Sequence, residues 1–281
     1  MIIIETIKEL KEIIRNNKKQ GKNIGFVPTM GYLHEGHLSL IQAARKENDL
    51  VVVSIFVNPT QFGVGEDLES YPRDLARDTQ LSQSAGADII FHPAVSEMYP
   101  DNYFTYVEVN EITNRLCGLS RPTHFRGVTT VVNKLFNIVE PDKAYFGQKD
   151  AQQVAVIQKM VRDLNMNVEI IPCPIVREAD GLAMSSRNTY LSPEQRQAAL
   201  ILSKTLFAAK EKIQQGMQDA VELKNWMLQN INSEPLANID YVEIVDAFDL
   251  NEVKNIQGSI LIALAVKFGK TRLIDNIRVE V

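Results

Sequence analysis

Short apolar segments alternate with segments of helical apolar spacing through about the first 170 residues, and this alternation constrains the fold more than any other feature. The pattern predicts strands at 23–27, 50–57, 87–91, 104–109, 143–146 and 168–171, and helices at 4–17, 38–46, 73–85, 128–139 and 151–164. Strands that are joined through helices run parallel, and a parallel sheet is covered by helices on both faces. The alternation therefore predicts an α/β domain with a doubly wound, Rossmann-like parallel sheet.

The pattern changes at Pro172 and Pro174, where two prolines remove ladder donors and stiffen the chain. This point is a plausible domain edge, so we expect domains at 1–176 and 177–281. Ser192 and Pro193 open a long predicted helix with a capping residue followed by a first-turn proline. A helix at 220–231 and strands at 239–245, 259–267 and 271–278 follow, which predicts a smaller α+β C-terminal domain that covers the active site.

Charge and hydropathy exclude several classes of protein. Thirty Lys and Arg against 35 Asp and Glu give a net charge of -5, without the basic footprint of a nucleic-acid binder. Glu5 ends the opening apolar run before a signal-peptide core forms, and the longest later apolar stretch is far too short to cross a bilayer. We expect a soluble, cytoplasmic protein that binds no membrane. Cys117 and Cys173 are too few for a disulfide framework and are expected as buried free thiols.

A histidine pair follows the first predicted sheet strand, in the segment 28–37 that reads PTMGYLHEGH. Ligands bind beyond the carboxyl ends of parallel strands, and a helix that begins there offers free N–H groups to phosphate. His34 and His37 would add donors at that helix start, and Gly36 would let a flat ring such as adenine approach the backbone. The pair therefore favours a nucleotide phosphate site. Two metal ligands and two incidental surface histidines are the alternatives.

Two further clusters suit phosphate binding. Ser185, Ser186 and Arg187 lie in a loop beyond the proposed domain edge and could grip a triphosphate, although a solvated capping loop is an equal alternative. Lys149 and Asp150 follow a predicted strand, where the ammonium could bind phosphate and the carboxylate Mg²⁺. An ordinary exposed turn is the alternative for this pair.

A last group of polar residues follows the second predicted sheet strand. Asn58, Gln61 and Tyr71 belong to it, and neutral amides can donate to a carboxylate without neutralising it, which suggests a polar small substrate. Gln153 lies one helical turn beyond Asp150 and faces the same way. The Asn-Pro pair is also a simple turn signal, so a structural role is the alternative.

Together these segments resemble the pantothenate synthetase family (pantoate-beta-alanine ligases), within the HxGH-type nucleotidyltransferases. The resemblance covers the chain in five blocks, which read PTMGYLHEGHLSL at 28–40, FVNPTQF at 56–62, YPR at 71–73, HFRGVTTVVNKLFNIVEPDKAYFGQKDAQQ at 124–153 and VREADGLAMSSRNTYLS at 176–192. It implies an AMP-forming ligase of coenzyme A biosynthesis that uses ATP to join (R)-pantoate to β-alanine through pantoyl adenylate. It also suggests a homodimer.

The resemblance also implies residue roles. His37 corresponds to the proton donor of the family, Gln61 to a residue that binds both pantoate and β-alanine, and Gln153 to a pantoate-binding residue. The positions that correspond to the ATP site are Met30, Gly31, Tyr32, Leu33, His34, Glu35, Gly36, His37, Gly147, Gln148, Lys149, Asp150, Val176, Met184, Ser185, Ser186 and Arg187.

Electrostatics extends this set. His34, Lys149, Ser185, Ser186 and Arg187 are expected to stabilise the pentavalent phosphorus, with Asn58 and Tyr71 beside the substrate. ATP is used as its Mg²⁺ complex, and we expect the ion at Asp150 and Asp78. Cys117 stands where the family often has glutamate, which puts any role of that carboxylate in doubt here.

Two other functions fit part of the pattern. An adenylyltransferase acting on a phosphorylated small molecule would keep AMP in its product, but the amides Asn58, Gln61 and Gln153 favour a carboxylate and an amine as substrates. A nucleotide-sensing module without turnover would not need both the histidine pair and the Ser-Ser-Arg loop.

Overall fold

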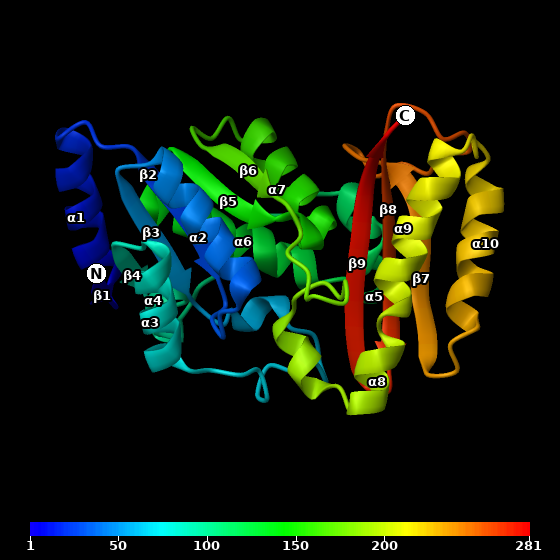
Figure 1. Cartoon of the computed structure of the whole chain (residues 1–281). Helices are drawn as coiled ribbons and strands as arrows, with labels where there is room; N and C mark the ends of the chain where they lie inside the picture. The colour runs from blue at the N-terminus through cyan, green and yellow to red at the C-terminus, as the bar shows by residue number, and fades with distance from the viewer.

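The computed structural model describes residues 1–281, and its larger sheet has six parallel strands in the order β1-β4-β3-β2-β5-β6 (Figure 1). The strands are β1 (Ile2–Ile4), β2 (Ile24–Thr29), β3 (Leu50–Ile55), β4 (Ile89–Phe91), β5 (Lys143–Gly147) and β6 (Glu169–Cys173). From β2 the chain moves outward through β3 to β4, and β5 and β6 are then added on the other side of β2. This reversal leaves a crevice at the carboxyl ends of β2 and β5, where open α/β sheets bind ligands.

Helices cover both faces of this sheet, as the alternation predicts. Every residue of β3 is buried, which is typical of a parallel strand covered on both sides. One face packs against α1 (Ile7–Lys19), α6 (His124–Val139) and α7 (Ala151–Asp163), and the other against α2 (Glu35–Glu47) and α3 (Leu75–Ala85). The prediction of a Rossmann-like α/β sheet is confirmed.

Shorter helices occupy the connections. They are η1 (Pro59–Gln61) after β3, α4 (Val95–Met98) after β4, then η2 (Ile112–Asn114) and α5 (Cys117–Ser120), η3 (Gln148–Asp150) after β5, and η4 (Ser186–Tyr190) after β6. Because η1 comes after β3 and η3 comes after β5, on the two sides of β2, both bring polar residues to the same edge of the sheet.

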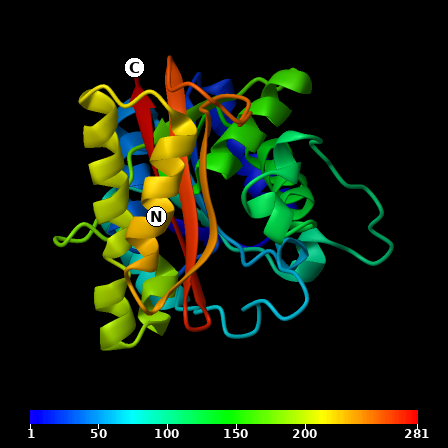
Figure 2. The same ribbon diagram turned by 90° about the vertical axis from the view of Figure 1, so that its right-hand side faces the viewer.

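A second, antiparallel sheet contains β7 (Ala237–Asp246), β8 (Ser259–Phe268) and β9 (Thr271–Glu280) in that order. Residues of α9 (Ile201–Gln214) and α10 (Ala220–Asn232) pack on one face of it, and both helices lie in front of the sheet in Figure 2. Its other face packs on the larger unit, where Leu261 and Ala263 join a cluster with Phe125 and Ala155. The predicted smaller α+β unit is therefore confirmed.

Three sequence predictions of secondary structure are wrong or incomplete. Residues 104–109 form no strand, because the α6 side chains of Thr129 and Thr130 bond to the backbone of Val107 in place of a strand partner. The helix predicted from Ser192 is two helices, α8 (Pro193–Ala198) and α9, since the ψ angles of the two intervening residues are near -20° and tighten the turn. The helix predicted at 4–17 begins only at Ile7, because Ile2–Ile4 form the edge strand β1, which pairs with β4.

None of the helices combines the length and the apolar composition that a membrane crossing requires.

Candidate active site

A cavity of about 240 Å³ opens at the carboxyl ends of β2 and β5, in the crevice that the strand order creates. Its walls come from the segment after β2, from η1 with the first turns of α6, from the segment after β5, and from residues 174–187. The side chains predicted to stabilise the phosphates all line this one cavity, although they are far apart in sequence. They are His34, His37, Lys149, Ser185, Ser186 and Arg187.

The two histidines at the start of α2 are held by backbone hydrogen bonds. The Nδ1 atom of His34, the N-cap residue, accepts the N–H of Gly36 at 3.1 Å, and Nδ1 of His37 accepts the N–H of His34 at 3.3 Å. A neutral imidazole whose Nδ1 is an acceptor carries its proton on Nε2. Each ring therefore has an Nε2–H donor left for a ligand in the cavity.

Both imidazoles are neutral at neutral pH. Burial, together with the nearby ammonium of Lys149, lowers the pKa of His34 to about 4. Burial and the adjacent His34 lower the pKa of His37 well below its usual value. The ring centroids lie 4.1 Å apart, so two imidazolium ions would repel each other strongly. The site presents two neutral donors to an anion instead of two cations.

A buried carboxylate fixes the loop in front of these histidines. One oxygen of Asp78, on α3, accepts the N–H of Tyr32 and the other accepts the N–H of Leu33, each at 2.7 Å. Asp78 is only 1% exposed and does not line the cavity. The prediction of a magnesium ligand at Asp78 is therefore corrected: the carboxylate is buried away from the cavity and bonds to the backbone of the loop, so its role is to position the loop.

Two glycines of this loop are required by close packing. Gly31 has a positive φ of 86°, and a Cβ there would lie 2.9 Å from Oδ2 of Asp78. At Gly36 a Cβ would lie 2.9 Å from Cε1 of His34. Gly36 therefore makes room for the His34 ring. It also lines the cavity, and the expectation that it lets adenine approach stays a prediction.

The segment after β5 brings two charged side chains to the cavity. Lys149 and Asp150 both line it, and neither has an ion-pair partner or a side-chain hydrogen bond. Gln153 lines the same cavity from the first turn of α7, as its spacing predicts. The side chain of Gln148 lies outside the cavity wall, and only its carbonyl group has a defined partner, Asn276 of β9.

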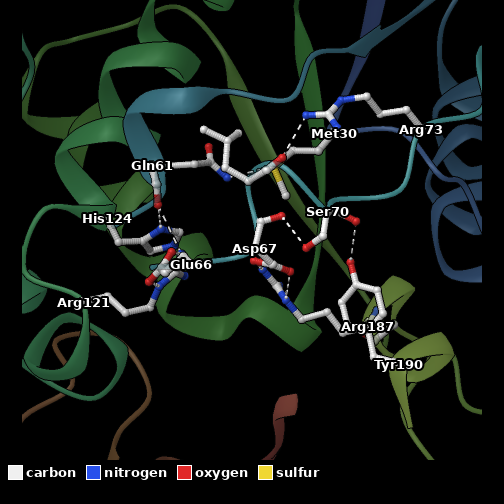
Figure 3. A network of polar contacts seen from close by, with 12 residues as sticks. Met30, Gln61, Glu66, Asp67, Ser70, Arg73, Arg121, His124, Arg187 and Tyr190 are labelled. Carbon is white, nitrogen blue, oxygen red and sulfur yellow. Dashed lines mark hydrogen bonds and ion pairs between the residues drawn. The ribbon is translucent and has the colours of Figure 1, made fainter. Parts of the chain in front are cut away.

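The Ser-Ser-Arg segment closes the cavity from the side of the second unit. The hydroxyl of Ser186 donates to the carbonyl oxygen of Tyr32 at 3.3 Å and so joins η4 to the histidine loop. The guanidinium of Arg187 donates to both oxygens of Asp67, at 3.0 and 2.9 Å (Figure 3). Arg187 is thus paired in this structure, and it can reach a phosphate only by leaving or sharing that carboxylate.

Residues 2–278 match the family model for pantoate-beta-alanine ligase. The chain belongs to this family. A pantothenate synthetase of Acetivibrio thermocellus is 65% identical over 281 residues, which is all of both chains. The crystal structure of pantothenate synthetase from Thermus thermophilus has a TM-score of 0.94 at 46% identity and covers 99% of each chain. A ligase from Francisella tularensis, described as complexed with beta-gamma ATP and beta-alanine, has a TM-score of 0.80 at 39% identity over 99% of this chain and 97% of its own.

Membership of the pantoate-beta-alanine ligase family confirms the predicted fold and the predicted ligase function. It also decides against the adenylyltransferase and the nucleotide sensor as descriptions of this chain. Most residues that the resemblance assigned to ATP or substrate line the ligase cavity. Those that do not line it are Gly31, Tyr32, Leu33, Glu35 and Gln148.

Two predicted substrate residues of the ligase differ in their freedom to bind. Asn58 is 1% exposed, its oxygen accepts from Thr60 and Tyr99, and its amide nitrogen donates to Gln61 and Gly127. Asn58 lines the cavity, but its amide is already bonded to protein partners, so a substrate would have to share or replace them; its substrate role stays a prediction. The amide nitrogen of Gln61 contacts only the sulfur of Met30, a weak acceptor, and is free to turn to a ligand oxygen.

Sequence reasoning missed a network of charges behind Gln61. Arg121 forms an ion pair with Glu66 and also donates to the Gln61 carbonyl at 3.2 Å, and a ring nitrogen of His124 lies 2.9 Å from the same oxygen (Figure 3). Burial and the nearby Arg121 lower the pKa of His124 to about 4, so its neutral ring donates through Nδ1. No local motif marks these residues, since each partner is more than 50 positions away.

Proposed function

We propose that this chain condenses (R)-pantoate with β-alanine in two steps at the described cavity, with ATP as co-substrate. In the first step a carboxylate oxygen of pantoate bonds to the α-phosphorus of ATP as the bond to the β-phosphate breaks and pyrophosphate leaves. In the second step the amine of β-alanine attacks the acyl carbon of pantoyl adenylate, and AMP leaves with the bridging oxygen. The products are pantothenate, AMP and pyrophosphate.

This proposal rests on one observation: hydrogen-bond donors of several kinds surround the same crevice. Two neutral Nε2–H groups, one unpaired ammonium and the Ser-Ser-Arg segment surround the same space at the switch point of the sheet. Donors held in place before reaction stabilise charge that grows on a phosphorus in its transition state, because they need little reorganisation. His37 would act here as a neutral Nε2–H donor.

The opposite wall supports a pantoate site. Gln61 and Gln153 supply amides, while Phe56, Val128 and Val131 supply apolar surface for the gem-dimethyl group of pantoate. An amide can orient a carboxylate without the full charge neutralisation of a cation, so the oxygen stays nucleophilic. Tyr71 lines the cavity near Arg187, and burial raises the pKa of its phenol and keeps it a neutral donor.

Asp150 is the residue that fits a magnesium ion. Mg²⁺ in nucleotide sites takes one or two carboxylates together with phosphate oxygens and water, and Asp150 is a carboxylate of the cavity wall without a partner. No cluster of three or more protein ligands is present, so the phosphates of ATP would complete the coordination. The ion would neutralise charge on the phosphate oxygens.

The remaining sequence predictions stay proposals. We place the domain boundary near residue 176, between β6 and the two-residue bridge of Arg177 with Ala183. A homodimer is supported by exposed aromatic side chains between α4 and η2, where Phe104 is 81% exposed and Tyr106 is 49% exposed. The backbone of this segment projects from the body of the molecule in Figure 2. The cytoplasmic location stays a prediction.

The test is AMP release by the purified protein with ATP, Mg²⁺, pantoate and β-alanine. We expect sustained release only with both organic substrates, and with pantoate alone no more than about one pyrophosphate per site, because the adenylate stays bound. AMP release that does not depend on pantoate, or a product that keeps AMP, would contradict the proposal.

A further inference from the structure

A direct link joins the smaller sheet to the phosphate side of the cavity. The side-chain amide of Asn276, on β9, donates to the carbonyl oxygens of Gln148 at 3.0 Å and Lys149 at 2.8 Å. These carbonyls belong to η3, the turn that carries Lys149 and Asp150. One residue of the C-terminal unit thus holds the backbone of a phosphate-binding turn in the N-terminal unit.

The position of the Lys149 ammonium depends on this backbone. No salt bridge or side-chain hydrogen bond holds its Nζ atom, whereas the arginines Arg121 and Arg187 are each fixed by a carboxylate. A flexible four-carbon stem adds no orientation of its own. The location of the charge beside His34 is therefore set by where η3 places the Cα atom.

Asn276 is itself held firmly. It is 3% exposed, and its own N–H donates to Oδ1 of Asp275 at 2.8 Å. The guanidinium of Arg177 donates to both carboxylate oxygens of Asp275, at 2.7 and 2.9 Å. Opposite Asn276 on β8 lies Ala263, a small residue of the apolar cluster between the two units. Arg177, Asp275 and Asn276 form a buried chain that ends on η3.

The choice of asparagine also points to a positioning role. Two carbonyl acceptors need two donors from one small group, which the amide –NH₂ supplies and a carboxylate or hydroxyl does not. The other amide atom, Oδ1, is buried without a partner, an arrangement that is unfavourable and uncommon in folded proteins. The amide therefore keeps this orientation for the two bonds to η3.

We propose that Asn276 is a positioning residue of the ligase reaction, which acts through Lys149 on the phosphates of ATP. The inference rests on the proposed function of Lys149, and it makes the C-terminal sheet part of the ATP site through a backbone contact. Without the Asn276 amide η3 can relax, so the ammonium no longer lies where the phosphates of ATP bind.

The experiment is a double-mutant cycle of Asn276→Ala with Lys149→Ala in the full chain, read by KM for ATP, by kcat and by direct binding of ATP in a calorimeter. We expect Asn276→Ala to raise KM for ATP about tenfold, equivalent to about 1.4 kcal/mol, with KM for pantoate changed less than twofold. In the Lys149→Ala background the same substitution should have almost no further effect, because residues that act as a unit are not additive.

Asn230→Ala is the matched control, since Asn230 donates to Thr205 within the C-terminal unit and touches nothing in the cavity. It should lower the melting temperature without changing KM for ATP. If Asn276→Ala does not fold, Asn276→Ser, which keeps one donor in a smaller side chain, should show an intermediate rise.

An unchanged KM for ATP in a folded Asn276 variant, or fully additive effects with Lys149→Ala, would overturn the inference. Failure of the proposed function is a separate result, because it would appear as wild-type protein that releases no AMP while calorimetry still reports the effect of Asn276 on ATP binding.

Discussion

The two sides of the cavity are built in different ways. The histidine wall, residues 30–37, is fixed by backbone N–H groups that donate to Asp78 and to the imidazoles themselves. The arginine wall, formed by Arg121 and Arg187 with Glu66 and Asp67, is fixed by ion pairs between side chains from distant segments. The first wall needs no rearrangement to meet a phosphate, whereas the second must exchange a carboxylate for it.

This difference suggests that the two walls have different roles in the reaction. Fixed neutral donors are suited to the transition state of the reacting phosphorus, because they are preorganised and insensitive to salt. Partly exposed ion pairs contribute little free energy and can be exchanged for a ligand. The histidine wall should therefore govern turnover, and the arginine wall should govern ATP affinity.

The largest effect is expected for His37→Ala, which removes one preorganised donor. The kcat of the full reaction should fall about 10² to 10³-fold. Because His37 also accepts a backbone N–H at the start of α2, its loss should destabilise the fold by only about 1 kcal/mol. AMP release and a thermal melt measure the two quantities. His92→Ala is the control, since His92 lies outside the cavity; a normal rate for His37→Ala would remove it from the mechanism.

The second largest effect is expected on stability, when the Asp78 carboxylate that holds the histidine wall is changed. Asp78→Asn places an amide –NH₂ against one of two backbone N–H groups. The free energy of unfolding should therefore fall by about 1.5–3 kcal/mol, the range for a lost hydrogen bond to a charged group. Urea denaturation measures this loss. Asp74→Asn, which keeps an acceptor at the exposed N-cap of α3, should change stability far less. Equal losses in the two variants would show that the buried carboxylate is not the anchor.

The third prediction is a pH dependence of stability. The pKa values of His34 and His124 are lowered to about 4, so between pH 6.5 and 4 the unfolded chain binds protons that the folded chain does not. The free energy of unfolding is therefore highest above about pH 6.5 and decreases as the pH falls toward 4. The slope is up to about 1.4 kcal/mol per pH unit for each ring. Urea titrations of wild type and His124→Gln isolate one ring. Identical slopes in the two proteins would contradict the lowered pKa.

The smallest effect is expected at the ion pair of the arginine wall. Asp67→Asn should change the free energy of unfolding by less than about 1 kcal/mol, because both partners are partly exposed. It should lower KM for ATP about twofold to threefold by freeing Arg187 for phosphate, and Arg187→Met should raise it about tenfold. Steady-state kinetics in ATP distinguishes the two walls. A higher KM for ATP in Asp67→Asn would mean that the pair is part of the binding geometry.

The comparison of the two walls also explains what the sequence could predict. The parallel sheet and the histidine wall follow from local patterns, such as the apolar run of β3 and a helix start directly after β2. The sequence marks Asp78 only as a carboxylate near the site, because a spacing in sequence does not say that it bonds to Tyr32 and Leu33.

Non-local contacts account for most of the other differences. Nothing in the sequence around Arg187 points to Asp67, 120 residues away, or in that around Lys149 to Asn276, 127 residues away. Likewise the side chains of α6 take the place of a strand partner for residues 104–109. Such pairings are decided by how the elements pack.

The central claim is that a pantoate carboxylate oxygen attacks the α-phosphorus of ATP at the histidine wall. Pantoate labelled with ¹⁸O in its carboxylate tests this most directly, by mass spectrometry of the AMP that is released. The account predicts one ¹⁸O atom in each AMP, because the bridging oxygen of the adenylate leaves with the phosphate when β-alanine attacks the acyl carbon. AMP without the label, formed together with pantothenate, would contradict it.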